Sequence, residues 1–157
     1  MRGRRPADSS VIQYEVMLSK DANSAGNVHG GVVVKHIFTT AGVVASRHSR
    51  GNAVTVSIDA LDFYNPIFAD NLLILKSTVN MVGRTSMEIG LRAEAEDISS
   101  GKLNHVTSAY LTFVALDSDG RPREVPPLVL KTKEEKRRER DALRRRSAKL
   151  AQKARKE

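Results

Sequence analysis

One short segment of this sequence brings together residue types that could do chemistry. Residues 21–31, DANSAGNVHGG, contain the amide side chain of Asn23 and the consecutive glycines Gly30 and Gly31, directly before a long apolar stretch. If a helix begins at these glycines, its first backbone N–H groups lack an intrahelical acceptor and carry the positive end of the helix dipole. Such N–H groups can polarise a carbonyl oxygen, as an oxyanion hole does, and an asparagine side chain can orient a water or a carbonyl beside them. An ordinary Asn- and Gly-rich loop that closes onto a helix explains the same composition equally well.

The elements that must position this segment follow from the apolar pattern. Residues 11–19 alternate between apolar and polar side chains and predict a strand, whereas residues 32–48 are apolar on nearly all sides and favour a buried helix. Four further strands, separated by turn residues, are predicted over residues 53–61, 72–82, 86–97 and 103–116. Short turns join antiparallel neighbours, so we expect an α+β domain in which a curled antiparallel sheet of about five strands surrounds one central helix, the hot-dog fold.

Length and charge divide the chain into one folded domain and an appended segment. The 157 residues are 40% hydrophobic and 28% charged, as expected of a single globular domain. Up to Leu130 there are 13 Lys and Arg residues and 13 Asp and Glu residues, whereas residues 131–157 hold 13 and 5 and therefore carry the net charge of +8. We expect an N-terminal arm at 1–10, the hot-dog domain at 11–128 and a basic helix or tail at 129–157.

Several classes of protein are excluded by what the sequence lacks. It has no cysteine, which excludes disulfides, cysteine-ligated metals and a thiol nucleophile. No apolar run approaches the roughly 18 residues of a membrane span, and the N-terminus lacks the apolar core of a signal peptide. We therefore expect a cytoplasmic protein, while Arg2, Arg4 and Arg5 keep mitochondrial import as the alternative.

The charged tail favours a helix, but not a firmly docked one. Its Ala, Leu, Lys, Arg and Glu residues have good helix propensity, yet its apolar residues are too few for a sustained seam. Glu135 with Glu139 and Lys136 with Arg140 are like-charged pairs, which argue against a stable isolated helix. The cations could bind nucleic acid, but no aromatic side chain lies among them for base stacking, so this partner is the weaker alternative.

The order of residues in several segments resembles the hot-dog acyl-CoA thioesterases of the brain acyl-CoA hydrolase type. The segments that carry the resemblance are residues 21–31, 41–48 (AGVVASRH), 54–63 (VTVSIDALDF), 85–89 (TSMEI), 109–116 (AYLTFVAL), 120–121 (GR) and 125–127 (VPP). The likeness covers about residues 10 to 150. It implies hydrolysis of the thioester between a fatty acyl group and coenzyme A, without a metal and with coenzyme A only as part of the substrate. It also implies homo-oligomers in which hot-dog dimers assemble into hexamers, with active sites at the dimer interface.

The resemblance assigns roles to individual residues and reveals one departure. Asn23 matches the catalytic loop asparagine of the family, and the helix N-terminus at Gly30 and Gly31 would bind the thioester oxygen. In two-domain relatives the asparagine works opposite a helix carboxylate of the other half, which acts as base or nucleophile. Counting from Gly31, that carboxylate falls at Phe38, and residues 32–48 contain no carboxylate. Loss of a positioned base typically costs a factor of about 10² to 10⁴ in rate.

Three accounts of this departure remain open. In the first, the protein hydrolyses thioesters with a substitute group: the Thr39 hydroxyl, which we take as the catalytic candidate, the Thr40 hydroxyl, or His36 or His29 as a base. A packed helix histidine is the simpler interpretation of His36. In the second account, the protein supplies only the Asn23 half of a site and pairs with a paralogous subunit that carries the aspartate. In the third, it is a catalytically silent hot-dog subunit of a heteromeric or nucleic-acid-containing assembly.

Recognition of coenzyme A requires cations for its phosphates. Arg84, followed by the hydroxyl residues Thr85 and Ser86, is the best candidate, because the family places coenzyme A contacts in this region. Arg47 is a weaker candidate, as is Arg50. A solvated turn residue explains an isolated arginine as well.

Two carboxylates lie in the predicted strand over residues 53–61 and just beyond it. Asp59 and Asp62 are three residues apart, so a continuous strand would place them on opposite faces of the sheet. We expect Asp62, which precedes Phe63, to serve as a hydrogen-bond anchor rather than as the base.

Overall fold

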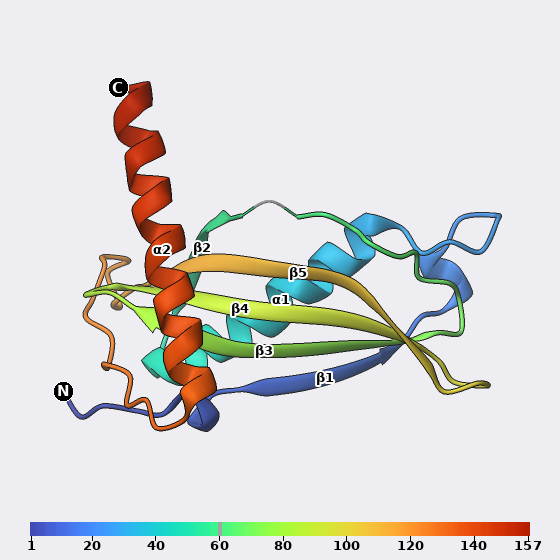
Figure 1. Cartoon of the computed structure of the whole chain (residues 1–157), viewed down its shortest axis with the longest axis horizontal. Coiled ribbons are helices and arrows are strands. Elements are labelled where there is room, and N and C mark those ends of the chain that lie inside the picture. The colour runs from blue at the N-terminus through green and yellow to red at the C-terminus, as the bar shows by residue number, and fades with distance from the viewer. Residues whose placement is uncertain (60) are drawn as a thin grey trace.

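A five-stranded antiparallel sheet wraps around one long helix, which confirms the predicted hot-dog fold. The computed structural model describes residues 1–59 and 61–157. The strand order is β1-β3-β4-β5-β2, so β1 and β2 form the two edges (Figure 1). The elements are β1 (Val11–Val16), α1 (Gly30–Ser49), β2 (Ala53–Ile58), β3 (Leu72–Val82), β4 (Ser86–Asp97), β5 (Lys102–Ala115) and α2 (Lys133–Lys156).

The core lies between α1 and the inner face of the sheet. Ile37, Ala41 and Val44 are fully buried, and their spacing of three and four residues places them on one side of α1. They pack in one apolar cluster with sheet residues such as Leu75 and Leu111. Because α1 is buried along most of its length, the sheet fixes the position of its N-terminus.

Two predicted strands end earlier than the alternating pattern suggests. The first ends at Val16, and Met17 turns inward to full burial. The second ends at Ile58, so Asp59 and Asp62 lie beyond it and the opposite-face argument does not apply. Ala60, within the predicted strand 53–61, lies outside the described residues.

The basic tail forms a regular helix, α2, with stabilising charge pairs that the like-charge argument overlooked. At its N-terminus, Thr132 and Glu135 form a reciprocal capping box. Along its exposed face, Arg137 pairs with Glu134 three residues earlier and with Asp141 four residues later. These pairs of opposite charge support the helix locally.

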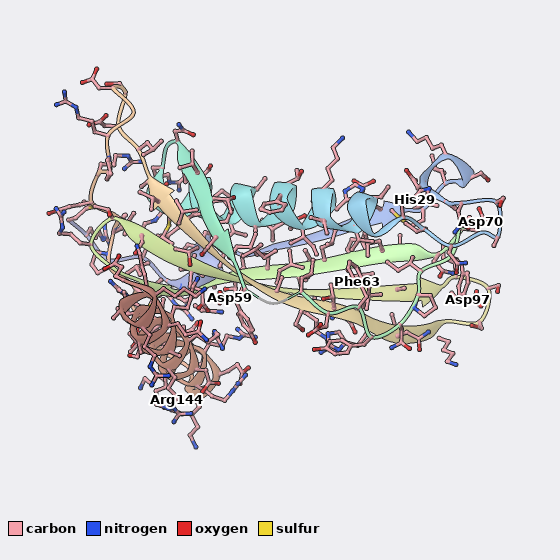
Figure 2. All side chains as sticks on the ribbon, turned by 90° about the horizontal axis from the view of Figure 1, so that it is seen from above. His29, Asp59, Phe63, Asp70, Asp97 and Arg144 are labelled. Atoms are coloured by element: carbon pink, nitrogen blue, oxygen red, sulfur yellow. The ribbon has the colours of Figure 1, made fainter. Side chains whose placement is uncertain are left out.

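The first half of α2 is also docked firmly on the outer face of the sheet, contrary to the expected loose contact. Glu88 of β4 is buried and accepts two hydrogen bonds from Arg145, at 2.7 and 3.1 Å, and a third from Asn80. The Arg145 guanidinium lies 3.6 Å from the centroid of the Tyr110 ring. Further along, Lys149 reaches Asp59 at 2.9 Å. Figures 1 and 2 show α1 and α2 on opposite faces of the sheet.

At the C-terminal end of α1, buried His48 is held as a neutral imidazole. Its Nε2 lies 2.8 Å from the Pro126 carbonyl oxygen, which can only accept, so Nε2 carries the proton. Its Nδ1 has no hydrogen-bond partner in the described part of the chain. Burial lowers the pKa of His48 below the ordinary 6.5, and the hydrogen bond to Pro126 offsets only part of this effect.

This environment predicts a loss of stability in mild acid. Unfolded His48 binds a proton more readily than folded His48, so the free energy of unfolding falls as the pH drops from about 6.5 towards the folded pKa. His48→Gln keeps a donor for Pro126 and removes the titration. We expect urea denaturation over a pH series to show that the free energy of unfolding of this variant changes less steeply with pH, by up to about 1.4 kcal/mol per pH unit. A wild-type slope in His48→Gln would contradict the assignment.

Candidate active site at the N-terminus of α1

The loop before α1 holds the Asn23 side chain with its amide hydrogens facing outward. The Asn23 Oδ1 atom accepts hydrogen bonds from the backbone N–H groups of Ala25 at 3.0 Å and Asn27 at 3.1 Å. Since both partners are donors, the oxygen must point into the loop. Asn23 therefore offers its NH₂ group to a ligand, as a donor, while its acceptor is already engaged.

Backbone hydrogen bonds fix this loop against the segment that follows β2. The Val28 N–H donates to the Ile67 carbonyl at 2.8 Å, and the Ala69 N–H donates to the Gly26 carbonyl at 3.0 Å. Gly26 has a φ of 86°, a conformation that favours glycine. The loop is thus positioned by residues about 40 positions later in the chain.

The N-terminus of α1 is open to solvent. His29 occupies the N-cap position. Among the described residues, its side chain makes no cap and its carbonyl accepts a hydrogen bond only from the Val32 N–H. The Gly30 and Gly31 N–H groups have no acceptor among residues 1–59 and 61–157. A Cβ on Gly31 would meet nothing within 4 Å. Both glycines are helical, so they contribute an unobstructed N–H pair rather than a special backbone conformation.

An apolar cavity lies directly beside this helix terminus. It has a volume of about 400 Å³ and is lined by Val28, Gly30, Val33, Phe63, Tyr64, Asn65, Pro66 and Ile67. The Phe63 ring would lie 3.7 Å from a Cβ on Gly30, and Figure 2 shows His29 and Phe63 along the same half of the molecule. Sequence reasoning missed this cavity; the aromatic pair after Asp62 was the available signal. Asp62 itself accepts a hydrogen bond at its carbonyl from Thr107, at 2.7 Å.

The structure separates the helix residues considered as replacements for the family carboxylate. Thr40 is buried and donates to Gln13 of β1 at 2.5 Å, and His36, one turn earlier, lies on that same flank. Phe38 shares the other flank with Gly42, which faces Phe113 of β5. Thr39 is exposed, and its hydroxyl donates to the carbonyl four residues earlier, at 2.9 Å.

The residues expected to bind coenzyme A gather at the opposite end of the protomer. The Arg84 carbonyl accepts a hydrogen bond from the Val125 N–H. The next residue, Pro126, contacts His48 at the C-terminal end of α1, so Arg84 lies near that end of the helix. Thr85 lies in the same β3–β4 turn, and Ser86 is the first residue of β4. Helix α1, with 20 residues, separates this end from Gly30 by about 30 Å.

The expected role of Arg47 is also constrained by the structure. Its guanidinium donates to the backbone carbonyls of Asp8 and Ser10, both at 3.2 Å, and so holds the N-terminal arm. Arg50, at the end of the same helix, has a left-handed backbone with a φ of 57°. Within one protomer, Asn23, Gly30 and Gly31 therefore form one group, and the arginines form another.

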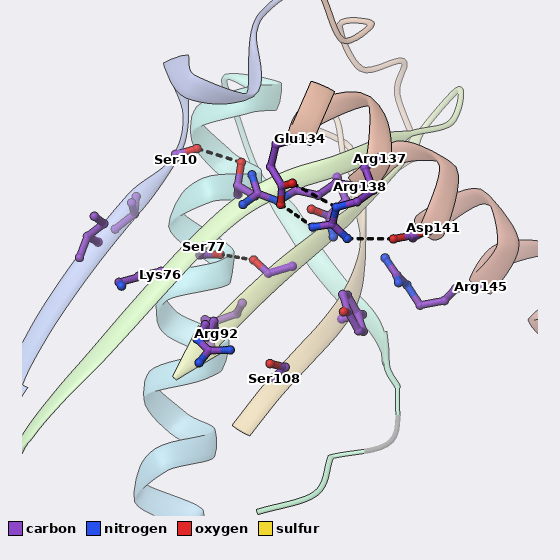
Figure 3. Close-up of a pocket in the computed structure, with 17 residues that line it drawn as sticks. Ser10, Lys76, Ser77, Arg92, Ser108, Glu134, Arg137, Arg138, Asp141 and Arg145 are labelled. Carbon is purple, nitrogen blue, oxygen red and sulfur yellow. Dashed lines mark hydrogen bonds and ion pairs between the residues drawn. The ribbon is translucent and has the colours of Figure 1, made fainter. Parts of the chain in front are cut away.

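A second hollow, of about 520 Å³, lies between α2 and the outer face of the sheet (Figure 3). Cations from both elements line it, but their charges are largely neutralised by neighbours. The pairs are Lys76 with Glu94 at 2.8 Å, Arg137 with Asp141 at 3.1 Å and Arg145 with Glu88 at 2.7 Å. This hollow is therefore the seam along which α2 docks.

Comparison with known proteins relates this architecture to thioesterases. Residues 25–102 match the sequence model of the thioesterase superfamily. An acyl-CoA thioester hydrolase of Bacillus subtilis, YkhA, is 36% identical over 128 residues, which are 82% of this chain and 74% of that protein. The human cytosolic acyl coenzyme A thioester hydrolase is 38% identical over 120 residues, 75% of this chain but only 32% of that protein.

Solved structures extend the similarity to nearly the whole chain. A hexameric acyl-CoA thioesterase has a TM-score of 0.93 and 32% identity, covering 98% of this chain and 99% of that one. The acyl-CoA hydrolase of Staphylococcus aureus, in complex with butyryl coenzyme A and coenzyme A, has a TM-score of 0.89 and 27% identity, covering 98% and 93%. No helix in the described part of the present chain is long and apolar enough to cross a membrane.

Proposed function

Because this chain belongs to the acyl-CoA thioester hydrolases of the thioesterase superfamily, we propose that it hydrolyses acyl-CoA to a free acid and coenzyme A. Water adds to the thioester carbonyl carbon, the C–S bond breaks, and the sulfur leaves as the coenzyme A thiol after taking up a proton. Coenzyme A enters only as part of the substrate. The names of the mammalian relatives also support a cytoplasmic location.

One observation carries the proposal: the uncapped N-terminus of α1 presents two free N–H groups beside an asparagine donor. In the addition step, the carbonyl oxygen gains negative charge. The Gly30 and Gly31 N–H groups, at the positive end of the helix dipole, stabilise that charge. The outward Asn23 NH₂ group can donate to the same oxygen or to the attacking water. The apolar cavity beside Gly30 suits the acyl chain.

Assembly of identical copies would unite the two separated groups of site residues. At the free edge of β2, Val54 and Val56 are exposed. Two copies paired antiparallel along β2 run in opposite directions, so the Arg84 turn of one copy lies towards the α1 N-terminus of the other. We infer a homodimer of this kind as the catalytic unit, assembled further into a hexamer as in the similar hexameric thioesterase.

The proton acceptor must differ from the carboxylate that the family resemblance implies at Phe38. His36 and Thr40 lie on the β1 flank of α1, away from Phe38, and the Thr39 hydroxyl is bonded to its own helix. His29 is exposed, directly precedes Gly30 and makes no side-chain cap. An imidazole can accept a proton near neutral pH, so we propose His29 as the base in the homo-oligomer.

Release of free thiol from acyl-CoA substrates of increasing chain length tests the function. We expect turnover by the wild type and a loss of about a hundredfold in kcat for Asn23→Ala, the usual cost of one oxyanion donor. His29→Gln should also lower kcat, by at least about tenfold. Asn104→Ala, the same change at an exposed strand position, is the matched control and should keep wild-type activity. Absence of thiol release at every chain length would overturn the proposed activity.

A further inference from the structure

The side chain of Arg146, on α2, reaches the turn between β3 and β4. A Cβ on Gly83 would lie 2.9 Å from the Arg146 Nη1 atom and 2.9 Å from the Ser86 Oγ atom. Any side chain at position 83 would therefore push the guanidinium and the hydroxyl aside, whereas glycine leaves both against the backbone of the turn. Arg146 thus joins the turn that carries Arg84.

Backbone hydrogen bonds fix this turn and leave its polar side chains free. The Val125 N–H donates to the Arg84 carbonyl and the Ala115 N–H donates to the Thr85 carbonyl, both at 3.0 Å. Arg84 is exposed, and Thr85 and Ser86 are half-buried. Within residues 1–59 and 61–157, their side chains make no hydrogen bond or ion pair. A fixed backbone with a free guanidinium and two free hydroxyl groups can hold a ligand in a defined position.

Helix α2 holds Arg146 at the turn through the neighbours of Arg146. Arg145 donates to buried Glu88 at 2.7 Å, and Lys149, one turn later, pairs with Asp59 at 2.9 Å. These contacts dock the helix on the outer face of the sheet, so the fold determines the position of Arg146 between them. Arg146 itself is exposed and has no hydrogen-bond or ion-pair partner in the part of the chain that the structure describes. Arg145 and Lys149 therefore have structural partners, whereas Arg146 does not.

Two unpaired arginines at one turn are the composition of an anion site. Like charges at one place repel, and a bound anion relieves this repulsion. A guanidinium offers a planar set of N–H donors that fits phosphate, and hydroxyl groups can donate further hydrogen bonds to the phosphate oxygens. We propose that Arg146 and Arg84, with Thr85 and Ser86, bind a phosphate group in the nucleotide portion of acyl-CoA. The choice of this ligand rests on the proposed function, and it gives α2 a part in substrate binding.

This placement makes Arg146 a determinant of substrate specificity. Acyl-CoA carries a diphosphate and a ribose phosphate, whereas an acyl-pantetheine has the same thioester and lacks these groups. The phosphates are remote from the reacting carbon, so a cation that binds them stabilises the ground state and the transition state equally. Loss of Arg146 should therefore raise KM for acyl-CoA and leave kcat nearly unchanged. Hydrolysis of the acyl-pantetheine should be unaffected, because Arg146 has no phosphate to bind there.

Thiol release from the same acyl group on both carriers tests this assignment. We expect Arg146→Ala to raise KM for acyl-CoA by about tenfold, the usual effect of losing one hydrogen bond to a charged group, and Arg146→Glu to raise it further. KM for the acyl-pantetheine should keep its wild-type value in both variants. Arg144→Ala, a change at a side chain 79% exposed on the same helix, is the matched control and should leave both KM values unchanged. An unchanged KM for acyl-CoA in Arg146→Ala, or an equal rise for both substrates, would overturn the assignment.

Calorimetric titration with coenzyme A tests the site without turnover. Coenzyme A should bind the wild type and Arg144→Ala with the same Kd, and Arg146→Ala about tenfold more weakly. Dephospho-coenzyme A, which lacks the ribose phosphate, identifies the group that is bound: an equal loss with this probe places Arg146 at the diphosphate, and no loss places it at the ribose phosphate. A wild type that binds coenzyme A but releases no thiol from acyl-CoA would contradict the proposed hydrolysis and leave this site intact. A wild-type Kd for coenzyme A in Arg146→Ala would refute the site, whatever the activity.

Discussion

Replacing Phe38 with aspartate in the His29→Gln variant is expected to raise kcat for acyl-CoA hydrolysis by about 10² to 10⁴, the usual contribution of a positioned general base, because that variant lacks the proposed base. Phe38 lies on the flank of α1 that faces β5, whereas Gln13 engages the opposite flank through Thr40. On that side lies the β2 edge, where the proposed partner copy would bring its own Asn23 loop. A carboxylate at this position could therefore take a proton from water held across the interface.

In the same background, the comparison of Phe38→Asp with Phe38→Asn isolates the base from the loss of the ring. Both variants remove a side chain that packs against the core, so both should lower the thermal midpoint by similar amounts. Only the aspartate can accept a proton, and only it should gain rate in a thiol-release assay. The gain should vanish when Asn23→Ala is added to Phe38→Asp. Equal kcat values for Phe38→Asp and Phe38→Asn would show that the side chain at position 38 does not lie beside the catalytic water.

The periodicity of the apolar side chains was sufficient to predict the fold, because helices and strands place their buried residues at regular intervals along the chain. In α1, Ile37, Ala41 and Val44 follow the helical period. Strands β4 and β5 largely alternate between apolar and polar side chains, and short turns separate β3, β4 and β5. The strand ends were less predictable. β2 ends at Ile58, and the next residue, Asp59, pairs with Lys149 of α2, 90 residues later, a contact that no local pattern expresses.

The candidate site was predictable only in part, for a related reason. The loop around Asn23 and the glycines is contiguous, so its order of residues was informative. The cavity beside Gly30 is completed by Phe63 and Tyr64, which reach it through a loop with no repeating pattern. The separation of Arg84 from Gly30 depends on the direction of α1 across the sheet, and no spacing in the sequence expresses that direction.

The docking of α2 also depends on long-range pairing, and it carries the second large expected effect. Arg145→Ala should lower the free energy of unfolding by about 3 to 5 kcal/mol, because it leaves the Glu88 carboxylate buried without its cation. Glu88 is only 5% exposed and would keep one hydrogen bond, from Asn80. Arg144→Ala is a control of the same type at the neighbouring position: the Arg144 side chain is 79% exposed and its contact with Asp141 is 3.4 Å long. This control should cost less than about 0.5 kcal/mol.

The cost should be asymmetric between the two partners, and this asymmetry distinguishes a buried ion pair from ordinary packing. In Glu88→Gln, the Arg145 side chain, already 25% exposed, can turn to water, so we expect a smaller loss than in Arg145→Ala. Adding Glu88→Leu to Arg145→Ala removes the stranded charge and should recover part of the stability. Urea denaturation of the four variants measures these differences. If Arg145→Ala cost no more than Arg144→Ala, the pair would not anchor α2, and the helix would have to be held by the fully buried Ala142 and the Lys149–Asp59 contact instead.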